Sequence, residues 1–488
     1  MRHSTLHRPN AMRHSATPWL TVRNALQAMA RPHRITLPTV ASPSERHPSI
    51  AGAGLSMAAH GLSADDEALL DRLEHAALGY FLQHTNPDNG LVADTSRPHS
   101  PCSIAVVGFA LSCYPIAVER GWMTRADALE RTLGTLRFFA NADHSGAAEA
   151  TGYKGFYFHF LDMHSGARAW QSELSVIDTA LLIAGVLSAA TYFDAECSGE
   201  VALRSLARSL YDRVDWRWAQ HDGTTLNHGW KPECGFLAYC WGGYSEAIVL
   251  YALALGSATH PIDSDCYRAW TATYQWENLY GHEFLYAGPL FVHQFSHAWI
   301  DLRGIRDRFM RGKRCDYFEN SRRATEVQRE YARRNPLERS GYDEDCWGLT
   351  ACDGPNADQP ELAGVTQRLF GYSARGVPYG PDDGSLGGWA AVASLPFAPA
   401  VAMRAVRDML QRYPEMLRDD RYASSFNPGL PGNNGEAWVS QGHYGLDQGI
   451  VVMMIENLRS GLPWRLMRTC PGIALGLRRA GFRGGWLA

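Results

Sequence analysis

The sequence lacks several features that would assign it to a common class of protein. No apolar run approaches the roughly 20 residues needed to cross a bilayer. No GxGxxG, GxxxxGKS/T or GxSxG motif occurs, which excludes the usual phosphate-binding loops and the serine-hydrolase elbow. The 10 cysteines form no CxxC pair and are too sparse for a disulfide scaffold. We therefore expect most of them to be buried apolar thiols and no structural zinc to be bound by cysteines.

A large excess of one charge is also missing, since 46 basic residues stand against 50 acidic ones. The charges are uneven, because residues 1–60 carry seven arginines and one acid, which leaves a net charge of −10 for the rest. An acidic body disfavours nucleic acid as a partner. What the chain has instead is 15 Trp and 21 Tyr, many beside polar residues and glycine. Such rings suit sugars or protein interfaces.

Residues 1–60 are rich in Arg, His, Pro, Ser and Ala and show no sustained period. We expect a disordered extension or a segment upstream of the true start of translation. The apolar core of a secretory signal is not legible there, so the sequence as given predicts a cytoplasmic location. The folded part is predicted to begin near Ser63, where Ser63 and Asp66 form a cap ahead of an amphipathic run over 65–84.

The rest of the chain shows one helical segment after another. Apolar residues recur near i, i+3, i+4 and i+7, and no segment of comparable length alternates like a strand, so the class is all-α. We expect residues 61–488 to form one domain. Helix-plus-loop units of about 35 residues favour a closed double ring of helices over an elongated array. Further helices are predicted over 103–121, 125–142, 174–193, 200–214, 246–257, 289–305, 320–335, 398–413 and 446–461, and long, functional loops over 214–243, 276–289, 340–390 and 421–443.

Two glutamates stand at predicted helix starts beside aromatic residues. Glu173 follows Trp170, at a helix predicted to begin near Ser172, and Glu246 follows Tyr244. Two carboxylates facing one cavity are what glycoside hydrolysis needs, one protonated and one ionised. A simpler interpretation is that Glu173 stabilises the first helical turn through the helix dipole. Asp178 lies among apolar residues, where a hydrogen-bonded structural carboxylate is equally expected.

Other segments carry polar and aromatic candidates. His293, His297 and Asp301 could place three metal ligands on one helix face, but HExxH is missing, so we prefer a polar face that lines the cavity or bonds to its wall. Glycine-rich loops with Trp, Tyr and Asp are typical of sugar-binding walls, although each residue could equally be a turn Asp or a packed ring. These binding candidates are Trp170, Trp241, Tyr244, His293, His297, Trp347, Asp353, Tyr379, Asp383, Trp438, Tyr444 and Asp447.

Several motifs occur in order from about residue 64 to 485, among them SIAVVGFAL, SELSVIDTALLIAG, YSEAIVLYALALGSATHP, HQFSHAWIDLRG, WGLTACDGP and YGLDQGIVVMMIENLRSG. Together they resemble the glucoamylase-like domain of glycoside hydrolase family 144. That family includes bacterial endo-β-1,2-glucanases and a sophorose-releasing exo-enzyme, and a similar domain occurs in cyclic β-1,2-glucan synthases. The resemblance implies an (α/α)6 toroid with a central active-site cleft.

The resemblance also implies hydrolysis of β-1,2-glucan, without metal or cofactor, by a monomeric and periplasmic enzyme that inverts configuration. It implicates Glu246, which we assign as general acid, and Glu173, as base or as the group that orients it, with Asp178 in support. Cys352 departs from the expected small residue such as Ser, and SLGG at 385–388 replaces a Thr-Val-Ala-Pro-like stretch. Endo action is preferred, while exo action, transglycosylation and a non-catalytic glucan-binding role stay open.

Overall fold

Two kinds of helix, distinguished by how much of their surface is buried, build the described part of the chain. The computed structural model describes residues 61–221, 223–356, 368–432 and 435–488, so the extension expected over residues 1–60 lies outside the described residues. The first helix, α1 (Ala64–Gln83), begins where the sequence predicts, because Ser63 and Asp66 form a reciprocal capping box.

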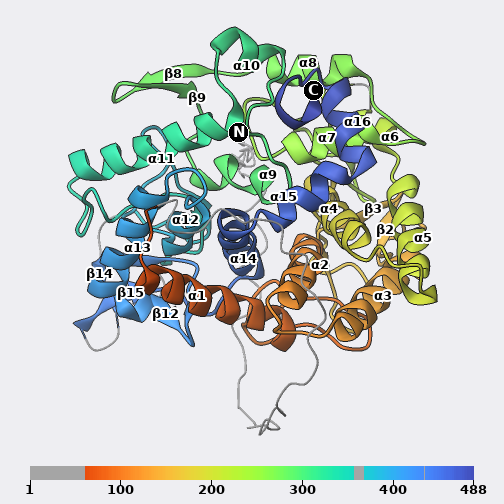
Figure 1. The fold of residues 1–488 in the computed structure, drawn as a ribbon, viewed down its shortest axis with the longest axis horizontal. Coiled ribbons are helices and arrows are strands. Elements are labelled where there is room, and N and C mark those ends of the chain that lie inside the picture. The colour runs from red at the N-terminus through yellow and green to blue at the C-terminus, as the bar shows by residue number, and fades with distance from the viewer. Residues whose placement is uncertain (1–60, 222, 357–367, 433–434) are drawn as a thin grey trace, which may run out of the picture. The chain divides into compact units, whose positions relative to one another are not determined.

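The inner layer consists of helices that are buried on almost every side. A helix that is apolar all round must be surrounded by other elements. Within residues 61–488, α2 contacts α4 and α14, α4 contacts α7, α7 contacts α9, and α14 contacts α9 and α12 (Figure 1). These helices are α2 (Ile104–Glu119), α4 (Val176–Tyr192), α7 (Ile248–Gly256), α9 (Phe295–Trp299), α12 (Gly388–Ala393) and α14 (Gly445–Arg459).

The outer layer consists of amphipathic helices that each bury one stripe against the inner layer. α1 packs against α14, α3 (Arg125–Asn141) against α2, α5 (Ser198–Arg213) against α4, α13 (Pro399–Arg412) against α12, and α16 (Pro471–Arg479) against α7. This double layer is the all-α, (α/α)6 toroid that was expected. The remaining described helices are α6 (Trp216–Gln220), α8 (Ser264–Thr271), α10 (Arg308–Lys313), α11 (Tyr317–Arg334) and α15 (Leu462–Thr469).

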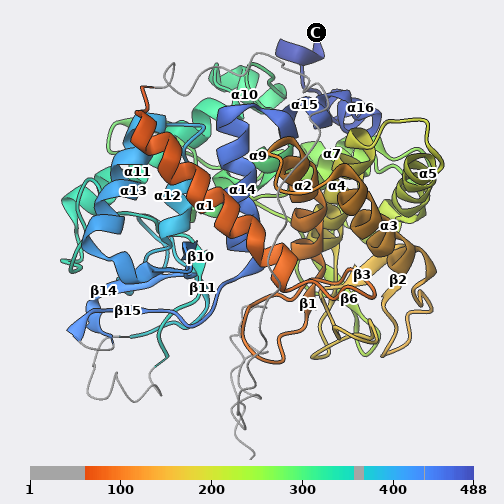
Figure 2. The ribbon, with the colours of Figure 1, turned by 60° about the horizontal axis from the view of Figure 1, so that its bottom comes forward.

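Short strands that were not expected lie in the predicted loops and in other segments between the helices. A five-stranded antiparallel sheet has the order β2-β3-β5-β6-β7, and the other strands pair in twos. Strands β2, β3 and β6 of this sheet and the pair β14–β15 lie toward the lower side of Figure 2. Most of these strands have two or three residues, too few to show alternation in the sequence. The sheet contains β2 (Gly152–Tyr153), β3 (Phe156–Phe158), β5 (Leu174–Ser175), β6 (Gly229–Lys231) and β7 (Gly235–Phe236). The pairs are β1 (Cys102–Ser103) with β4 (Phe160–Leu161), β8 (Trp276–Leu279) with β9 (His282–Leu285), β10 (Ala351–Cys352) with β11 (Ser373–Ala374), β12 (Leu417–Arg418) with β13 (Arg421–Tyr422), and β14 (Phe426–Pro431) with β15 (Ala437–Val439).

The continuous helix predicted over 289–305 is wrong. The chain forms a 3-10 turn, η3 (Leu290–His293), and then the short α9. Gln294 separates them with φ −117° and ψ −45°, and its side-chain amide donates to the carbonyl oxygen of Ala390 at 2.8 Å. The partner helix α12 was missed because its six residues are too few for a helical period. None of the described helices combines the length and hydrophobicity of a bilayer-spanning segment.

Hydrogen bonds between segments gather the starts of the inner helices at one end of the layer. Ile104, at the start of α2, donates its N–H to the carbonyl oxygen of His159 at 3.3 Å, and the N–H of His159 donates to that of Glu173 at 2.9 Å, just ahead of α4. The hydroxyl of Ser296 in α9 donates to the carbonyl oxygen of Glu246 at 2.5 Å, just ahead of α7. Residues that precede different inner helices are therefore neighbours in space.

The closest packing of inner helices depends on two glycines. A Cβ on Gly108 in α2 would lie 2.3 Å from the carbonyl oxygen of Leu181, and a Cβ on Gly185 in α4 would lie 2.1 Å from that of Gly108. Both contacts involve backbone atoms, so a side chain there requires the two helices to separate. By contrast, a Cβ on Gly134 in the outer helix α3 would meet nothing within 4 Å.

We expect Gly108→Ala to lower the free energy of unfolding by about 1–3 kcal/mol, because the methyl group overpacks the α2–α4 contact. The matched control Gly134→Ala should raise it by about 0.5–1 kcal/mol, because alanine favours an unobstructed helix. Urea unfolding of both variants and the wild type measures the two effects. Equal stability of Gly108→Ala and the wild type would contradict the close contact.

Candidate active site

Glu173 lies just outside helix α4 and not in its first turn. Ser175 is the N-cap of α4, since its hydroxyl oxygen accepts the N–H of Asp178 at 3.2 Å. Pairing of β5 with β3 and β6 keeps Leu174 and Ser175 extended. The predicted helix start near Ser172 is therefore wrong, and so is the interpretation of Glu173 as a first-turn residue. Its side chain is 25% exposed.

His159, which sequence reasoning missed, joins two of the predicted carboxylates. Its Nδ1 lies 2.9 Å from Oε1 of Glu173, and its Nε2 lies 3.6 Å from Oδ2 of Asp178. Burial alone would lower the pKa of His159, but the charges of Asp178 and Glu173 outweigh it and raise the pKa to about 9. His159 is therefore an imidazolium at neutral pH. The only signal for it in the sequence is a single His within an aromatic run over 156–160.

The carboxyl groups around His159 differ in their protonation. Burial opposes ionisation of Glu173, but the charge of His159 outweighs burial and holds the pKa of Glu173 below its usual value. Burial raises the pKa of Glu246 to about 7, and the negative charge of Asp178 adds to this effect. Burial likewise raises the pKa of Asp178, against the attraction of His159. At neutral pH, Glu173 is ionised and about half of the Glu246 carboxyl groups keep a proton. Carboxyl pairs held in different states are typical of acid and base catalysts.

Space for the Glu173 side chain depends on a glycine in the neighbouring strand. A Cβ on Gly229 in β6 would lie 3.0 Å from Cγ of Glu173. Lys231, two residues along the same strand, contributes a positive charge that helps to lower the pKa of Glu173. Strand β6 therefore both admits the Glu173 side chain and favours its ionised form.

Further acids belong to the same electrostatic neighbourhood. Asp447, in the first turn of α14, is buried, and burial raises its pKa well above the usual value, with Asp94 and Asp353 adding to the effect. Asp94, which was not predicted, also raises the pKa of His159 and so links the two groups. Asp353 forms an ion pair with Arg97.

Tyr444 lies in the same region as the Asp353–Arg97 pair. The guanidinium of Arg97 lies 5.6 Å from the centre of the Tyr444 ring, and that ring stacks on Tyr372 at 6.0 Å. Two predicted binding residues, Asp353 and Tyr444, are thus joined through Arg97.

The predicted residues beside Glu246 lie inside the helical layers. Tyr244 is 8% exposed, with its ring 5.2 Å from that of His293, and Trp241 packs against His228 at 4.3 Å. His293 Nε2 contacts the carbonyl oxygen of Ala287 at 3.1 Å, and burial lowers its pKa to about 4.

His297 contacts a residue of helix α11. Its Nε2 contacts the hydroxyl of Ser321 at 3.1 Å, and burial lowers the pKa of His297 to about 3. Asp301, the third potential ligand of that segment, pairs instead with Arg303 at 2.8 Å and with Arg468. The described residues contain no group of three or more His, Cys, Asp and Glu side chains arranged to hold a metal.

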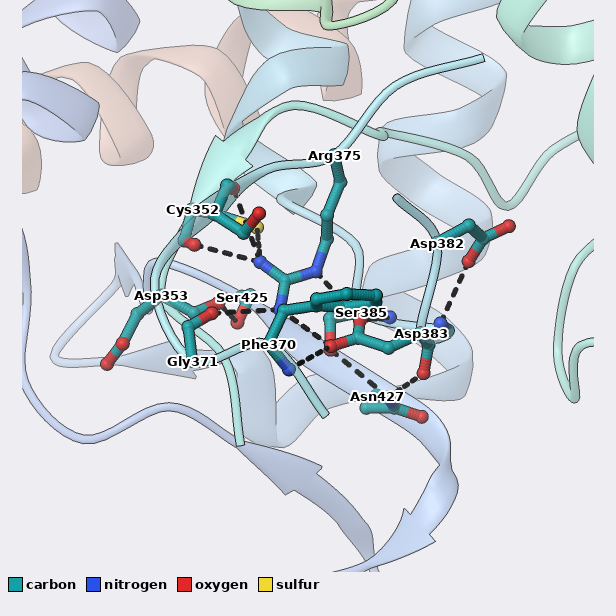
Figure 3. Close-up of polar contacts among 12 residues, drawn as sticks. Cys352, Asp353, Phe370, Gly371, Arg375, Asp382, Asp383, Ser385, Ser425 and Asn427 are labelled. Atoms are coloured by element: carbon teal, nitrogen blue, oxygen red, sulfur yellow. Dashed lines mark hydrogen bonds and ion pairs between the residues drawn. The ribbon is translucent and has the colours of Figure 1, made fainter. Parts of the chain in front are cut away.

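Asp383 belongs to a buried ion pair. Figure 3 shows Arg375 facing the Asp383 carboxylate, with Nε and Nη2 donating at 2.7 and 2.8 Å. Arg375 also donates to the carbonyl oxygens of Cys352 at 2.9 Å and Gly371 at 3.0 Å. Both charged side chains are fully buried. We therefore propose that Asp383 has a structural role instead of the predicted substrate contact, because its oxygens already bind Arg375 inside the protein.

Three further predicted residues lie in different surroundings. Trp438 packs in a small separate cluster with Leu430, and Trp347 is 1% exposed. Tyr379 is 69% exposed beside Tyr286, at a ring distance of 5.5 Å. Only Tyr379 of these three presents a ring to solvent.

Comparison with known proteins agrees with the sequence motifs. Residues 238–471 match a family model described as "Putative glucoamylase". This part of the chain is therefore similar to a glucoamylase-like domain. The exo β-1,2-glucooligosaccharide sophorohydrolase (non-reducing end) of Parabacteroides distasonis is 25% identical to this chain over 449 residues. That alignment covers 85% of this chain and 58% of the relative, so the chain spans less than two thirds of the relative's length.

Solved structures resemble most of this chain. A protein titled "putative glucoamylase" from Bacteroides uniformis has a TM-score of 0.76 and 27% identity, and the match covers 88% of this chain and 99% of that one. An endo-β-1,2-glucanase from Chitinophaga pinensis, solved with sophorotriose and glucose, has a TM-score of 0.72 and 26% identity, with 87% and 100% covered. The resemblance indicated by the sequence motifs is confirmed.

Replacement of His159 by Gln should lower the free energy of unfolding in a pH-dependent manner. Because the pKa of His159 is about 9 when folded and about 6.5 when unfolded, its protonation stabilises the fold fully below pH 6.5, and this stabilisation is lost as the pH rises through 9. A pKa shift of this size contributes on the order of 3 kcal/mol to the free energy of unfolding. Urea unfolding from pH 5.5 to 9.5 measures the difference between wild type and variant.

The control for this measurement is His164→Gln, which changes an exposed histidine in the same region. The free energy of unfolding of His164→Gln should differ little from that of the wild type at every pH. A His159→Gln difference that does not shrink toward pH 9.5 would mean that the imidazolium does not pair with Glu173 and Asp178.

Proposed function

We propose that this chain is a glycoside hydrolase that cleaves β-1,2-glucan, preferably within the chain, by general acid and base catalysis. One observation carries the proposal: Glu173 and Glu246 precede inner helices α4 and α7 and have opposite pKa shifts. The relatives support the substrate class, since one is named as a β-1,2-glucooligosaccharide sophorohydrolase and another as an endo-β-1,2-glucanase.

In this proposal Glu246 is the general acid. Its carboxyl group, with a pKa of about 7, donates a proton to the glycosidic oxygen as the bond to the anomeric carbon breaks. Ionised Glu173 accepts a proton from the water that attacks the anomeric carbon, or orients that water. Attack from the face opposite the leaving group inverts the configuration. Asp178 supports both groups, because it pairs with His159 and its charge raises the pKa of Glu246.

The products from linear β-1,2-glucan test the activity. We expect a ladder of short sophoro-oligosaccharides with new reducing ends, and no products from β-1,3- or β-1,4-glucan. Sophorose or glucose alone would indicate exo action, whereas longer or cyclic products without new reducing ends would indicate transglycosylation. Binding of the polymer without any cleavage would contradict the proposed hydrolysis and would indicate a glucan-binding protein.

Glu246→Gln is expected to reduce kcat by about 10²–10⁴-fold, because it removes the proton donor and preserves the shape of the side chain. In the wild type, activity should fall as the pH rises through about 7, where Glu246 loses its proton. Activity should also fall at acidic pH, below the usual carboxyl range, where Glu173 gains one. Initial rates between pH 3 and pH 9 measure both limbs.

The matched control is Glu130→Gln, an exposed glutamate on α3, which should keep the wild-type rate and pH profile. Glucan binding should be preserved in Glu246→Gln. Wild-type turnover in Glu246→Gln would remove Glu246 from the mechanism.

A further inference from the structure

An exposed tryptophan stands three residues ahead of Glu173, in the link between β4 and β5. Trp170 is 40% exposed, and both Trp170 and Gln171 adopt left-handed backbone conformations, with φ 56° and 50°. Two consecutive residues other than glycine rarely take this conformation, because the Cβ then crowds the backbone. Such strained residues persist only where surrounding contacts hold them, and they cluster at functional sites.

The contacts that hold this turn come from Arg168. Its side chain is 1% exposed, and its guanidinium donates to the carbonyl oxygens of Ser172 at 2.5 Å and Gln171 at 2.8 Å. It also forms a bidentate ion pair with Glu233, at 2.5 and 3.1 Å, and lies 4.6 Å from the centre of the Phe158 ring. Glu233 lies between β6 and β7, so the turn before Glu173 is clamped to the adjacent hairpin.

The indole of Trp170 continues an aromatic series that begins at the site. His159 stacks on Phe160 with ring centres 4.0 Å apart and planes at 10°, and Phe160 contacts Trp170 at 5.1 Å. The outer end of this series is open to solvent. An indole offers a large apolar face and an N–H at its edge, and these suit the C–H face and the hydroxyl groups of a sugar ring. The exposed position therefore fits a glucosyl unit that extends past the carboxylates.

We propose that Trp170 is the stacking platform for a glucosyl unit bound beside Glu173, and that Arg168 and Glu233 are positioning residues that hold the platform in place. This inference rests on the proposed function. The clamp acts before substrate arrives, so binding does not have to order the loop, and a preorganised platform binds more tightly than a mobile one. Trp170 therefore increases the affinity for substrate, whereas Glu246 and Glu173 transfer the protons.

The test compares KM, kcat and direct binding for three site variants and one control. Trp170→Ala should raise KM for linear β-1,2-glucan by at least about tenfold with kcat changed less than about threefold, because an exposed aromatic anchor contributes mainly to binding. Trp170→Tyr should restore most of the affinity. Glu233→Gln, which weakens the clamp, should have a KM between those of the wild type and Trp170→Ala. The control Leu475→Ala, on α16 and also 40% exposed, should match the wild type.

Calorimetric titration with β-1,2-glucooligosaccharides in the Glu246→Gln background should show the same order of affinities, and thermal unfolding should show similar Tm values for all variants. If the wild type hydrolyses the glucan and Trp170→Ala keeps its KM, the platform is overturned and the proposed function stands. A fall in kcat and Tm with KM unchanged would also overturn it, since that result means a structural role. If the wild type neither binds nor hydrolyses the glucan, the proposed function fails and the inference fails with it.

Discussion

Burial of the inner helices on every side is the constraint on which the rest of this structure depends. α7, over Ile248–Gly256, has no charged residue, and every one of its residues is buried. A carboxylate inside such a layer would lose its hydration without compensation. The charged side chains of the described inner helices therefore lie near helix ends. Asp178 and Asp447 lie in the first turns of α4 and α14, and Glu119 and Glu456 lie in the last turns of α2 and α14. The middle of an inner helix excludes charge, and Glu173, Asp178, Glu246 and Asp447 accordingly lie just ahead of such helices or in their first turns.

Within this group, one imidazolium determines how the carboxyl groups differ. His159 pairs with Glu173 and Asp178, and Glu246 is left without a positive partner among the causes that shift its pKa. Ionisation is thus favoured at Glu173 and opposed at Glu246, although both residues precede apolar helices and have aromatic neighbours. Chemistry that needs an acid and a base at the same pH follows from this asymmetry of surroundings.

Two buried arginines stabilise the loops around the acids in different ways. Arg375 and Asp383 are both fully buried, and their bonds join β10, the segment at Gly371 and the approach to α12. Arg168 pairs with Glu233, whose side chain is 48% exposed, and also donates to carbonyl oxygens of the strained turn at Trp170 and Gln171. The first pair unites segments of the interior, whereas the second presents a side chain to solvent.

Local pattern was enough to predict most helices of this chain. The run that begins at Ser63 and the helices α2, α3, α5, α13 and α14 depend on apolar periodicity and capping, which neighbouring residues encode. The motifs around Glu173 and Glu246 likewise carried the family resemblance. The six-residue α12 and the break at Gln294 escaped prediction, because contacts between distant segments determine them.

The sequence by itself determined the all-α class, the positions of most helices and the two glutamates, because each of these is written in a short stretch of chain. Only the tertiary structure decided that Glu173 lies outside its helix, that His159 stands between two carboxylates, and that Arg168 clamps the turn of Trp170. These arrangements arise from strand pairing and charge pairing between segments far apart in the chain, and no local period or spacing records which segments will meet.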